Sequence, residues 1–484
     1  MRLPNFIAGS YETRAVPLDS ERTINFYVER MESQGATSDS ALYPTPGMTE
    51  LDDALIGPGR AHAEFDGLEY AVIGGTFYTV NQSGTLTSVG AVAIDSNPAT
   101  LSYNGDGGGE ILVTSGGSAY IYDITAGTLS SQAGSWASAT CGDMLDGYFL
   151  ILDDTTATLW VSDLLDGTTW SSIQFLQRSE APDPWVGMRV HNNLIYLLGK
   201  KTSTVLFNAG TSPFPFEVHP SGRLHVGCAA GFSVAAGQGA IYWLGASKEG
   251  AGGVFRATGF SAERISTAPL QVKLEGLSKL SDATGEVVED QGHTFYLLTV
   301  PAAKITYAFD AQGSWTDRGT WDSSTGEYGV WRPTWHARAY GEPRWLDSDS
   351  GKLYRADHSV YTDAGGGVIR RLRRSPGLIY ENERLFYNSL ELDMDTGQGT
   401  ATGEGADPEV MMRYSNDGGR TWGNELWRSG GKIGEYLTRV RWNRLGSARK
   451  RVFEFVMTDP IPWKIMDCYL EMDQPPERIA REQR

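Results

Sequence analysis

The chain has 484 residues, of which 58 are glycine and 11% are aromatic, and a formal net charge of −18. It is too long for one ordinary domain, and its many glycines and lack of heptads favour short strands and tight turns over helices. The charge is uneven, because residues 370–484 hold 19 basic and 18 acidic side chains and nearly all the negative excess precedes them. Such an acidic surface is unfavourable for binding nucleic acid, because phosphate binding depends on Lys and Arg.

Cysteine usage and the first residues bear on the compartment. Cys141, Cys228 and Cys468 lie far apart and form no CxxC pair, which argues for assembly in a reducing compartment and against a disulfide framework. The first ten residues lack the apolar stretch of a signal peptide, and no apolar run is long enough to span a membrane. We therefore expect neither a signal peptide nor a membrane anchor.

Residues 1–60 are predicted to form an N-terminal extended arm. They include a short extended piece at Thr23–Val28 and a turn-rich stretch at Tyr43–Met48, where Pro44 and Pro46 keep the preceding residues extended. Such an arm could close a propeller by adding a strand to its last blade, or it could reach a neighbouring subunit.

Residues 61–369 are predicted to form a β-propeller, because one pattern recurs seven times along them. Each repeat has a short apolar strand, a glycine-containing turn and a second strand that carries an aromatic residue. The repeats are about 40 to 52 residues apart, which is the period of a four-stranded blade. The pattern is compatible with six or seven blades, and the count of repeats favours seven. The aromatic residues are Tyr78, Tyr120, Trp160, Phe207, Phe255, Tyr307 and Tyr354.

Turn and helix signals fit this picture. Asp66-Gly67, Asp146-Gly147 and Asp166-Gly167 are Asp-Gly steps typical of tight hairpin turns. Apolar runs such as Gly147–Asp154 indicate buried strands. Leu270–Leu280 is the one modest candidate for an amphipathic helix, and Gly276 weakens it.

Residues 370–474, which follow the glycine run Gly365–Gly367, are predicted to form a β-sandwich-like domain, and residues 475–484 a flexible tail. Alternation in one strand places Val440 and Trp442 on one face. The chain is therefore expected to be all-β, with a six- or seven-bladed propeller between an N-terminal arm and a C-terminal sandwich. The predicted C-terminal strands are Leu378–Leu392, Glu409–Tyr414, Leu437–Arg444, Arg451–Thr458 and Ile465–Met472.

The sharpest local motif is an Asp box, the hairpin sequence Ser-x-Asp-x-Gly-x-Thr-Trp of sialidase-like propellers. Its carboxylate is expected to cap backbone N–H groups of a tight turn, its glycine to take a positive φ, and its tryptophan to pack beneath the hairpin. In those enzymes the box is remote from the catalytic centre, so it predicts a structural turn. Its residues here are Ser415, Asp417, Gly419, Thr421 and Trp422.

No catalytic, cofactor-binding or metal-binding residues are predicted, and the chain is not expected to be an enzyme. GxSxG, HExxH, Walker and complete calcium-loop motifs are absent from the sequence. A sialidase-type site would need an arginine cluster and a Tyr–Glu pair, but the propeller arginines occupy no equivalent positions in successive repeats. The Asp box and the surface aromatic residues nevertheless keep a glycan-binding or glycan-cleaving propeller as the alternative.

Arg370, Arg371, Arg373 and Arg374 form a basic cluster at the start of the C-terminal domain. On a strand these charges cannot share one face. One interpretation is a solvated edge that resists β-pairing; the others are a subunit contact or a constriction of a channel.

The opening residues carry a resemblance to a known family. Phe6–Tyr11, Glu21–Tyr27 and Leu42–Gly47 resemble the start of the packaged-DNA stabilisation proteins of short-tailed bacteriophages, which are also described as tail hub or tail nozzle proteins. Ser162–Gly210 is similar to the same family's mid-propeller segment. No catalytic residues are known in this family, so none is carried over.

The resemblance implies a structural protein of the phage tail, assembled in the host cytoplasm and located in the virion. Family members form a homo-hexamer beneath the portal and its adaptor ring, which connects head and tail. They close the head after DNA packaging, give tail spikes or fibres a place to dock, adjoin a distal tail plug or needle, and line the channel for genome ejection. DNA would pass through this lumen without sequence recognition.

If subunits enclose a channel, the acidic excess before residue 370 predicts a lumen that is predominantly negative or neutral. A basic lining would hold DNA through counterion release, whereas an acidic or mixed one would let it slide. Any arginine ring, from Arg370–Arg374, is then expected at a subunit contact or a constriction.

Overall fold

The computed structural model describes residues 1–15, 19–31, 38–52, 57–178, 183–246, 252–379 and 383–473. The chain forms two compact units. The propeller unit comprises Met48–Gly313 and Tyr328–Asp357, and the sandwich unit comprises Met1–Gly47, Ser314–Glu327 and His358–Arg484. The predicted tail at residues 475–484 lies outside the described residues.

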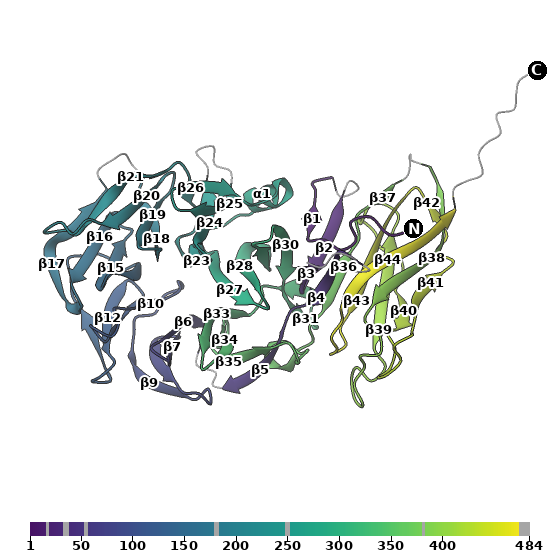
Figure 1. Cartoon of the computed structure of the whole chain (residues 1–484), viewed down its shortest axis with the longest axis horizontal. Helices are drawn as coiled ribbons and strands as arrows, with labels where there is room; N and C mark the ends of the chain where they lie inside the picture. The colour runs from purple at the N-terminus through teal and green to yellow at the C-terminus, as the bar shows by residue number, and fades with distance from the viewer. Residues whose placement is uncertain are drawn as a thin grey trace, which may run out of the picture. The chain divides into compact units, whose positions relative to one another are not determined.

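In its described residues the propeller unit contains seven antiparallel sets of strands that surround a centre (Figure 1). Six of these are separate sheets, and the sixth set in chain order is part of an 11-stranded sheet. The first four are β6 (Gly59–Phe65), β7 (Leu68–Ile73), β8 (Thr76–Val80) and β9 (Leu86–Ala91); β10 (Thr100–Tyr103), β11 (Glu110–Ser115), β12 (Ser118–Asp123) and β13 (Thr128–Gln132); β14 (Cys141–Leu145), β15 (Tyr148–Asp153), β16 (Thr158–Asp163) and β17 (Asp166–Gln177); β18 (Trp185–His191), β19 (Leu194–Gly199), β20 (Ser203–Asn208) and β21 (Phe216–Leu224). The last three are β22 (Gly227–Cys228), β23 (Ala235–Gly237), β24 (Ala240–Ala246), β25 (Gly252–Thr258) and β26 (Ser261–Arg264); β27 (Thr284–Asp290), β28 (His293–Val300) and β29 (Ile305–Asp310); β33 (Pro333–Ala339), β34 (Glu342–Asp347), β35 (Leu353–Asp357) and β5 (Gly47–Asp52).

The aromatic residues of the sequence repeat all fall on the third strand of a sheet. Tyr78 lies on β8, Trp160 on β16 and Tyr354 on β35, and the other four lie on β12, β20, β25 and β29. Each repeat therefore marks one sheet, and the all-β propeller predicted from the pattern is confirmed.

The second strand of each sheet is buried on both faces, which explains why these strands are continuous apolar runs. Phe149 and Ile151 of β15 pack toward the second sheet, while Leu150 and Leu152 pack toward the fourth. Because neighbouring sheets cover both faces, each side chain that leaves water contributes up to about 1.5–3 kcal/mol.

Two of the three Asp-Gly steps form the expected hairpin turns. Asp66 and Asp146 have φ of 52°, and the glycines that follow also have positive φ, as the turns favoured in hairpins require. Asp166 instead begins β17, and the turn before it is made by Leu164 and Leu165. The third turn thus lies two residues before its predicted place.

The predicted helix is present but shorter. α1 (Ala268–Glu275) begins after Thr267, whose hydroxyl accepts a hydrogen bond from the N–H of Leu270, and ends at Gly276.

The remaining short elements of the described residues are 3₁₀ turns and two short strands. The 3₁₀ turns are η1 (Gly231–Ser233), η2 (Pro301–Ala303) and η3 (Ala364–Gly366), and the strands are β31 (Thr320–Asp322) and β32 (Glu327–Gly329).

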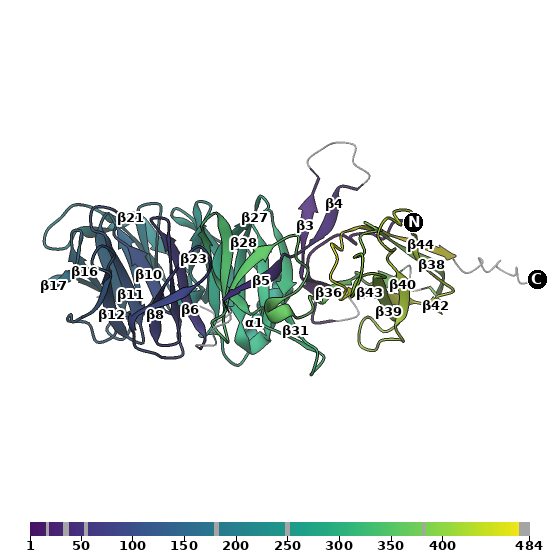
Figure 2. The same ribbon diagram turned by 90° about the horizontal axis from the view of Figure 1, so that it is seen from below.

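The sandwich unit packs two sheets over a shared apolar core, in which Trp442 and Trp463 are fully buried. Figure 2 shows the strands of this unit in a second view. Val440 is buried beside Trp442, as the alternation predicts. One sheet contains β1 (Tyr11–Glu12), β30 (Ser314–Arg318), β2 (Ser20–Ile24), β36 (Arg371–Arg374), β37 (Leu378–Ile379), β43 (Lys450–Met457), β39 (Glu409–Ser415) and β40 (Leu426–Ser429). The other contains β3 (Phe26–Arg30), β4 (Ser40–Pro44), β44 (Ile465–Asp473), β38 (Leu385–Met394), β41 (Val440–Asn443) and β42 (Ser447–Ala448).

The N-terminal residues are divided between the units, which differs from the predicted arm at residues 1–60. β5 is the fourth strand of the last propeller sheet, so the chain closes its ring with a strand from near its start. The preceding residues belong to the sandwich unit, where Leu3 and Phe6 lie in the core. The units divide at Gly47 and Asp357, with Ser314–Glu327 in the sandwich unit, rather than at the predicted residues 60 and 369; the boundary at residue 474 borders residues outside the described ranges and stays a prediction.

The three cysteines are free and buried, and burial raises the pKa of Cys141 and Cys228 to about 12. Among the described residues, no helix has both the length and the apolar character that a membrane crossing requires.

Candidate functional site

Three residues of the arginine cluster, Arg371, Arg373 and Arg374, lie on β36, which is a central strand rather than an edge, and Arg370 directly precedes it. β36 pairs with β2 on one side and with β43 on the other. The interpretation of the cluster as a solvated edge is therefore wrong, since both sides of the strand are occupied.

Arg373 is fully buried and holds the N-terminal segment. Its guanidinium donates to the carbonyl oxygens of Phe6 at 2.7 Å, Asn5 at 3.1 Å and Gly9 at 3.3 Å. It also donates to Thr23 Oγ1 at 2.8 Å and pairs with Glu21. Burial raises the pKa of Glu21 even though Arg373 opposes this shift, so the pair is held in a strongly desolvated place.

The other three arginines also contact groups of their own chain. Arg371 is fully buried; it donates to the carbonyl oxygen of Asp459 at 3.3 Å, and burial lowers its pKa to about 10. Arg374 bonds Glu454 at 2.8 Å, and Arg370 lies over the ring of Trp321, 4.3 Å from its centroid.

Burial decides what these arginines can do. Arg371 and Arg373 are enclosed within one chain, so neither side chain lies on a surface that could line a channel or meet another subunit. For these two residues the predicted contact or constriction is wrong. Arg370 and Arg374 are partly exposed, and for them it stays a prediction.

The Asp box folds as a turn that is built by its own carboxylate. Asp417 accepts hydrogen bonds from the N–H groups of Arg420 and Thr421, both at 2.9 Å, and from the hydroxyls of Ser415 and Thr421 at 2.6 Å. Gly419 has the positive φ expected of it, 102°. The hydrogen bond from Ser415, followed by those from Thr421, lowers the pKa of Asp417 far below its ordinary value.

Trp422 does not lie beneath the hairpin as expected. It is partly exposed and packs against two guanidinium groups, those of Arg374 and Arg413, each 4.9 Å from its ring centroid. Both arginines bond the buried carboxylate of Glu454. Trp422 therefore covers an ion-pair cluster rather than filling an apolar core.

The propeller unit encloses a cavity of about 410 Å³ at its centre. The first strand of six of the sheets, and β23 of the fifth, contribute to its wall, and its charged groups are of both signs, including Glu64, Arg189 and Arg338. His336 also lines it, and burial followed by the nearby His62 lowers the pKa of His336 to about 4. The cavity has the size of a small-molecule pocket.

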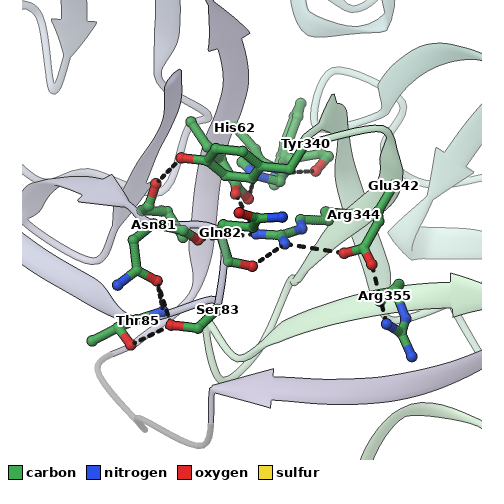
Figure 3. A network of polar contacts seen from close by, with 12 residues as sticks. His62, Asn81, Gln82, Ser83, Thr85, Tyr340, Glu342, Arg344 and Arg355 are labelled. Atoms are coloured by element: carbon green, nitrogen blue, oxygen red, sulfur yellow. Dashed lines mark hydrogen bonds and ion pairs between the residues drawn. The ribbon is translucent and has the colours of Figure 1, made fainter. Parts of the chain in front are cut away.

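Buried charges join the first and last propeller sheets (Figure 3). Arg344 of β34 pairs with Glu69 of β7 at 2.7 Å, and both side chains are buried. The other carboxylate oxygen of Glu69 lies 2.7 Å from Nε2 of His62, whose Nδ1 lies 2.9 Å from the carbonyl oxygen of Trp335. Both ring nitrogens thus lie within hydrogen-bond distance of oxygen atoms, which fix the orientation of the ring.

Further groups complete this closure network. Arg344 donates to the carbonyl oxygens of Gln82 at 2.5 Å and Asn81 at 3.2 Å, and pairs with Glu342 at 3.0 Å. Tyr340 lies under the guanidinium and donates to the carbonyl oxygen of Val80 at 2.7 Å (Figure 3). The network fixes the point where the ring closes, so it is a structural element.

Sequence reasoning missed this network. A signal was present, because Glu69 sits within an apolar strand segment and Arg344 within another, and a charge in a buried strand needs a partner. Nothing in the sequence pairs the two, since they lie 275 residues apart.

The geometry offers scaffolding rather than chemistry. The conspicuous carboxylates of the Asp box and of the closure network are occupied by turn N–H groups and arginines. Among the described residues no group of three or more His, Cys, Asp or Glu side chains is placed to hold a metal ion. The arrangement is that of an all-β structural protein built from a propeller and a sandwich.

This chain belongs to the bacteriophage P22 Gp10 family. Residues 1–360 match the family described as "Bacteriophage P22 Gp10, beta-propeller", and residues 370–473 match that described as "Bacteriophage P22 Gp10, beta-sandwich". It is therefore a bacteriophage structural protein of the kind that stabilises packaged DNA, as the resemblance of its opening residues indicated.

Other comparisons are weaker. No curated protein matches the sequence significantly. Among solved structures, virginiamycin B lyase from Staphylococcus aureus has 9% identity and a TM-score of 0.42 over 68% of this chain and 99% of its own. The N-terminal domain of Nup159 has 11% identity and a TM-score of 0.42 over 70% and 99%. The computationally designed Ika8 protein has 10% and 0.38 over 70% and 99%. None of these carries a functional argument.

Proposed function

We propose that the chain is the tail hub or nozzle subunit of a short-tailed bacteriophage. In this proposal it assembles as a homo-hexamer below the portal-adaptor ring, closes the head after packaging and lines the channel through which DNA leaves. Spikes or fibres and a distal plug or needle dock on it. Assembly takes place in the host cytoplasm.

The observation that carries the proposal is the pair of family matches, which cover the propeller and the sandwich in order along one chain. The fold is suited to a rigid structural role. Each unit has its own buried core, and the propeller ring is closed by a strand and by buried charges.

The size of the propeller cavity bears on where DNA would run. A cavity of about 410 Å³ is that of a small-molecule pocket, so duplex DNA does not pass through one propeller. A channel for DNA must instead be enclosed by several subunits. The excess of acidic residues before residue 370 then favours a predominantly negative or neutral lumen, along which DNA slides.

A packaging assay tests the proposal. Phage that lack this protein should lose DNA from filled heads, and the full chain supplied in trans should restore retention. Electron microscopy of the purified chain with its adaptor ring should show a six-fold ring on the adaptor. Heads that keep their DNA without the protein, or a chain that does not bind the adaptor, would overturn the proposal.

The glycan-cleaving alternative has a separate test. Purified protein should give no turnover of polysaccharide from candidate hosts. Reproducible turnover that is lost on substitution of a carboxylate would overturn the structural assignment in favour of an enzyme. Turnover unaffected by every such substitution would point to a contaminant and leave the DNA-retention result to decide.

A further inference from the structure

One loop of the sandwich unit presents apolar side chains to water. It lies between β40 and β41, and Ile433, Tyr436 and Leu437 on it are 61%, 66% and 95% exposed. Isolated exposed apolar residues are common, but three on one short loop form a patch of the kind that marks contact sites.

A groove of about 450 Å³ lies beside this patch. Its walls are the end of β38, the loop residues Tyr436 and Leu437, and Met466 and Tyr469 of β44. The loop side is apolar at Tyr436 and Leu437, and Thr438 and Arg439 follow them along the wall. Strand β38 and the residues directly after it supply the other side, where the charged residues are acidic: Glu391, Asp393 and Asp395.

Asp393 is the unusual member of this acidic wall. It stands directly opposite Asp467 in the pairing of β38 with β44, and like charges opposite each other destabilise a sheet. Burial, then Asp467, then Glu391 raise the pKa of Asp393. Burial likewise raises the pKa of Asp467, although Arg2 opposes this shift.

The surrounding cations are already used. Arg439 bonds Glu391 through both oxygens, and Lys464 lies 4.0 Å from Asp395. Arg2 pairs with Asp467. For Asp393 no ion pair is found within the described part of the chain, so one partly buried negative charge in the groove lacks a cation.

We propose that this groove binds a basic segment of another protein, with a Lys or Arg side chain at Asp393 and an adjoining apolar side chain against Tyr436 and Leu437. The negative charge of the groove selects a cationic side chain. The exposed loop adds buried apolar area, so the contact contributes more binding free energy than a surface ion pair alone. The inference rests on the groove alone and does not require the hexamer or the channel.

The same observations disfavour other occupants. DNA would be repelled by Glu391, Asp393 and Asp395, because phosphate binding needs Lys and Arg. A second copy of this chain would have to insert a basic, apolar segment of its own, and that case is distinguished by the mass of the purified protein.

The test uses the full purified chain and short fluorescein-labelled peptides. One peptide alternates Lys and Leu, a second has Glu in place of Lys, and a third has Ser in place of Leu. Fluorescence anisotropy should show binding of the first that is about tenfold or more tighter than of either other peptide. Asp393→Asn and Leu437→Ser should each weaken it by about tenfold or more.

Matched variants control for general attraction of a basic peptide to an acidic protein. Glu425→Gln removes an exposed carboxylate elsewhere in the sandwich unit, and Ile173→Ser removes an exposed aliphatic side chain on β17; neither should change the affinity. Hydrogen exchange should show protection by the peptide at residues 391–396 and 436–439. Binding should also weaken as the pH falls and Asp393 is protonated.

Stability measurements keep the test decisive. Asp393→Asn removes a repelling charge, so it should raise the melting temperature at neutral pH while it weakens peptide binding. Leu437 is almost wholly exposed, so Leu437→Ser should leave folding unchanged. Equal affinity of wild type and both variants, protection elsewhere, or a change in oligomer mass instead of peptide affinity would overturn the proposal.

Discussion

Arg373→Leu tests whether the buried guanidinium ties the N-terminal segment to the sandwich unit. The substitution removes hydrogen bonds to three backbone carbonyl oxygens and to Thr23, and it leaves the carboxyl group of Glu21 buried without its cation. Breaking a buried pair in this way costs about 3–5 kcal/mol. The pKa of Glu21 should rise further in the variant, because its cation is gone. The carboxyl group can then take up a proton, and this limits the loss of unfolding free energy to the range given above.

The sign of the pH dependence follows from that shift. A carboxyl group whose pKa is raised in the folded state binds more protons there than in the unfolded chain, so it favours folding more as the pH falls. The deficit of Arg373→Leu relative to wild type should therefore be largest at neutral pH and smaller in acid.

Urea unfolding followed by tryptophan fluorescence measures the cost, and hydrogen exchange over residues 5–24 locates it. The double variant Arg373→Leu/Glu21→Leu should lose less than the sum of the single variants, because the unpaired charge is gone. Arg449→Leu, a change at an exposed arginine of the same unit, should stay within about 0.5 kcal/mol of wild type. Stability of Arg373→Leu within that margin, with unchanged exchange over residues 5–24, would refute the reasoning.

Three further outcomes are expected. Asp417→Ala should lower the melting temperature at neutral pH, and its gap to wild type should shrink progressively as the pH falls below the ordinary Asp pKa of 3.8. The lowered pKa of Asp417 contributes its full stability above that unfolded value, and the contribution is lost as the pH falls through the folded value. Trp422→Ala should cost about 1–2 kcal/mol by urea unfolding, less than a core tryptophan, because Trp422 is partly exposed and packs against two guanidinium groups; a larger loss would mean that it is a core residue. Arg344→Met should destabilise the propeller unit by about 3–5 kcal/mol through the stranded Glu69, whereas the exposed Arg338→Met should not; equal denaturation midpoints would contradict the role of the closure network.

Local sequence patterns were enough to predict many structural features of this protein. The aromatic residue of each repeat marks the third strand of a sheet, because neighbouring sheets bury the same positions in every blade. The Asp box is predictable from eight consecutive residues, since Asp417 bonds only groups within a few positions of itself. Val440 and Trp442 follow the strand alternation into the core. All these features depend on contacts between neighbours in sequence or on a repeated environment.

Other features were decided only by the tertiary structure. Arg373 is buried because β2 and β43 flank its strand, and its partner Thr23 lies 350 residues away. Glu69 and Arg344 meet because the ring closes, which brings the first and last sheets together. A charged residue in a strand signals a need for a partner, but its sequence neighbours do not name one. The packing of strands from opposite ends of the chain therefore determines which arginines are buried and which are exposed.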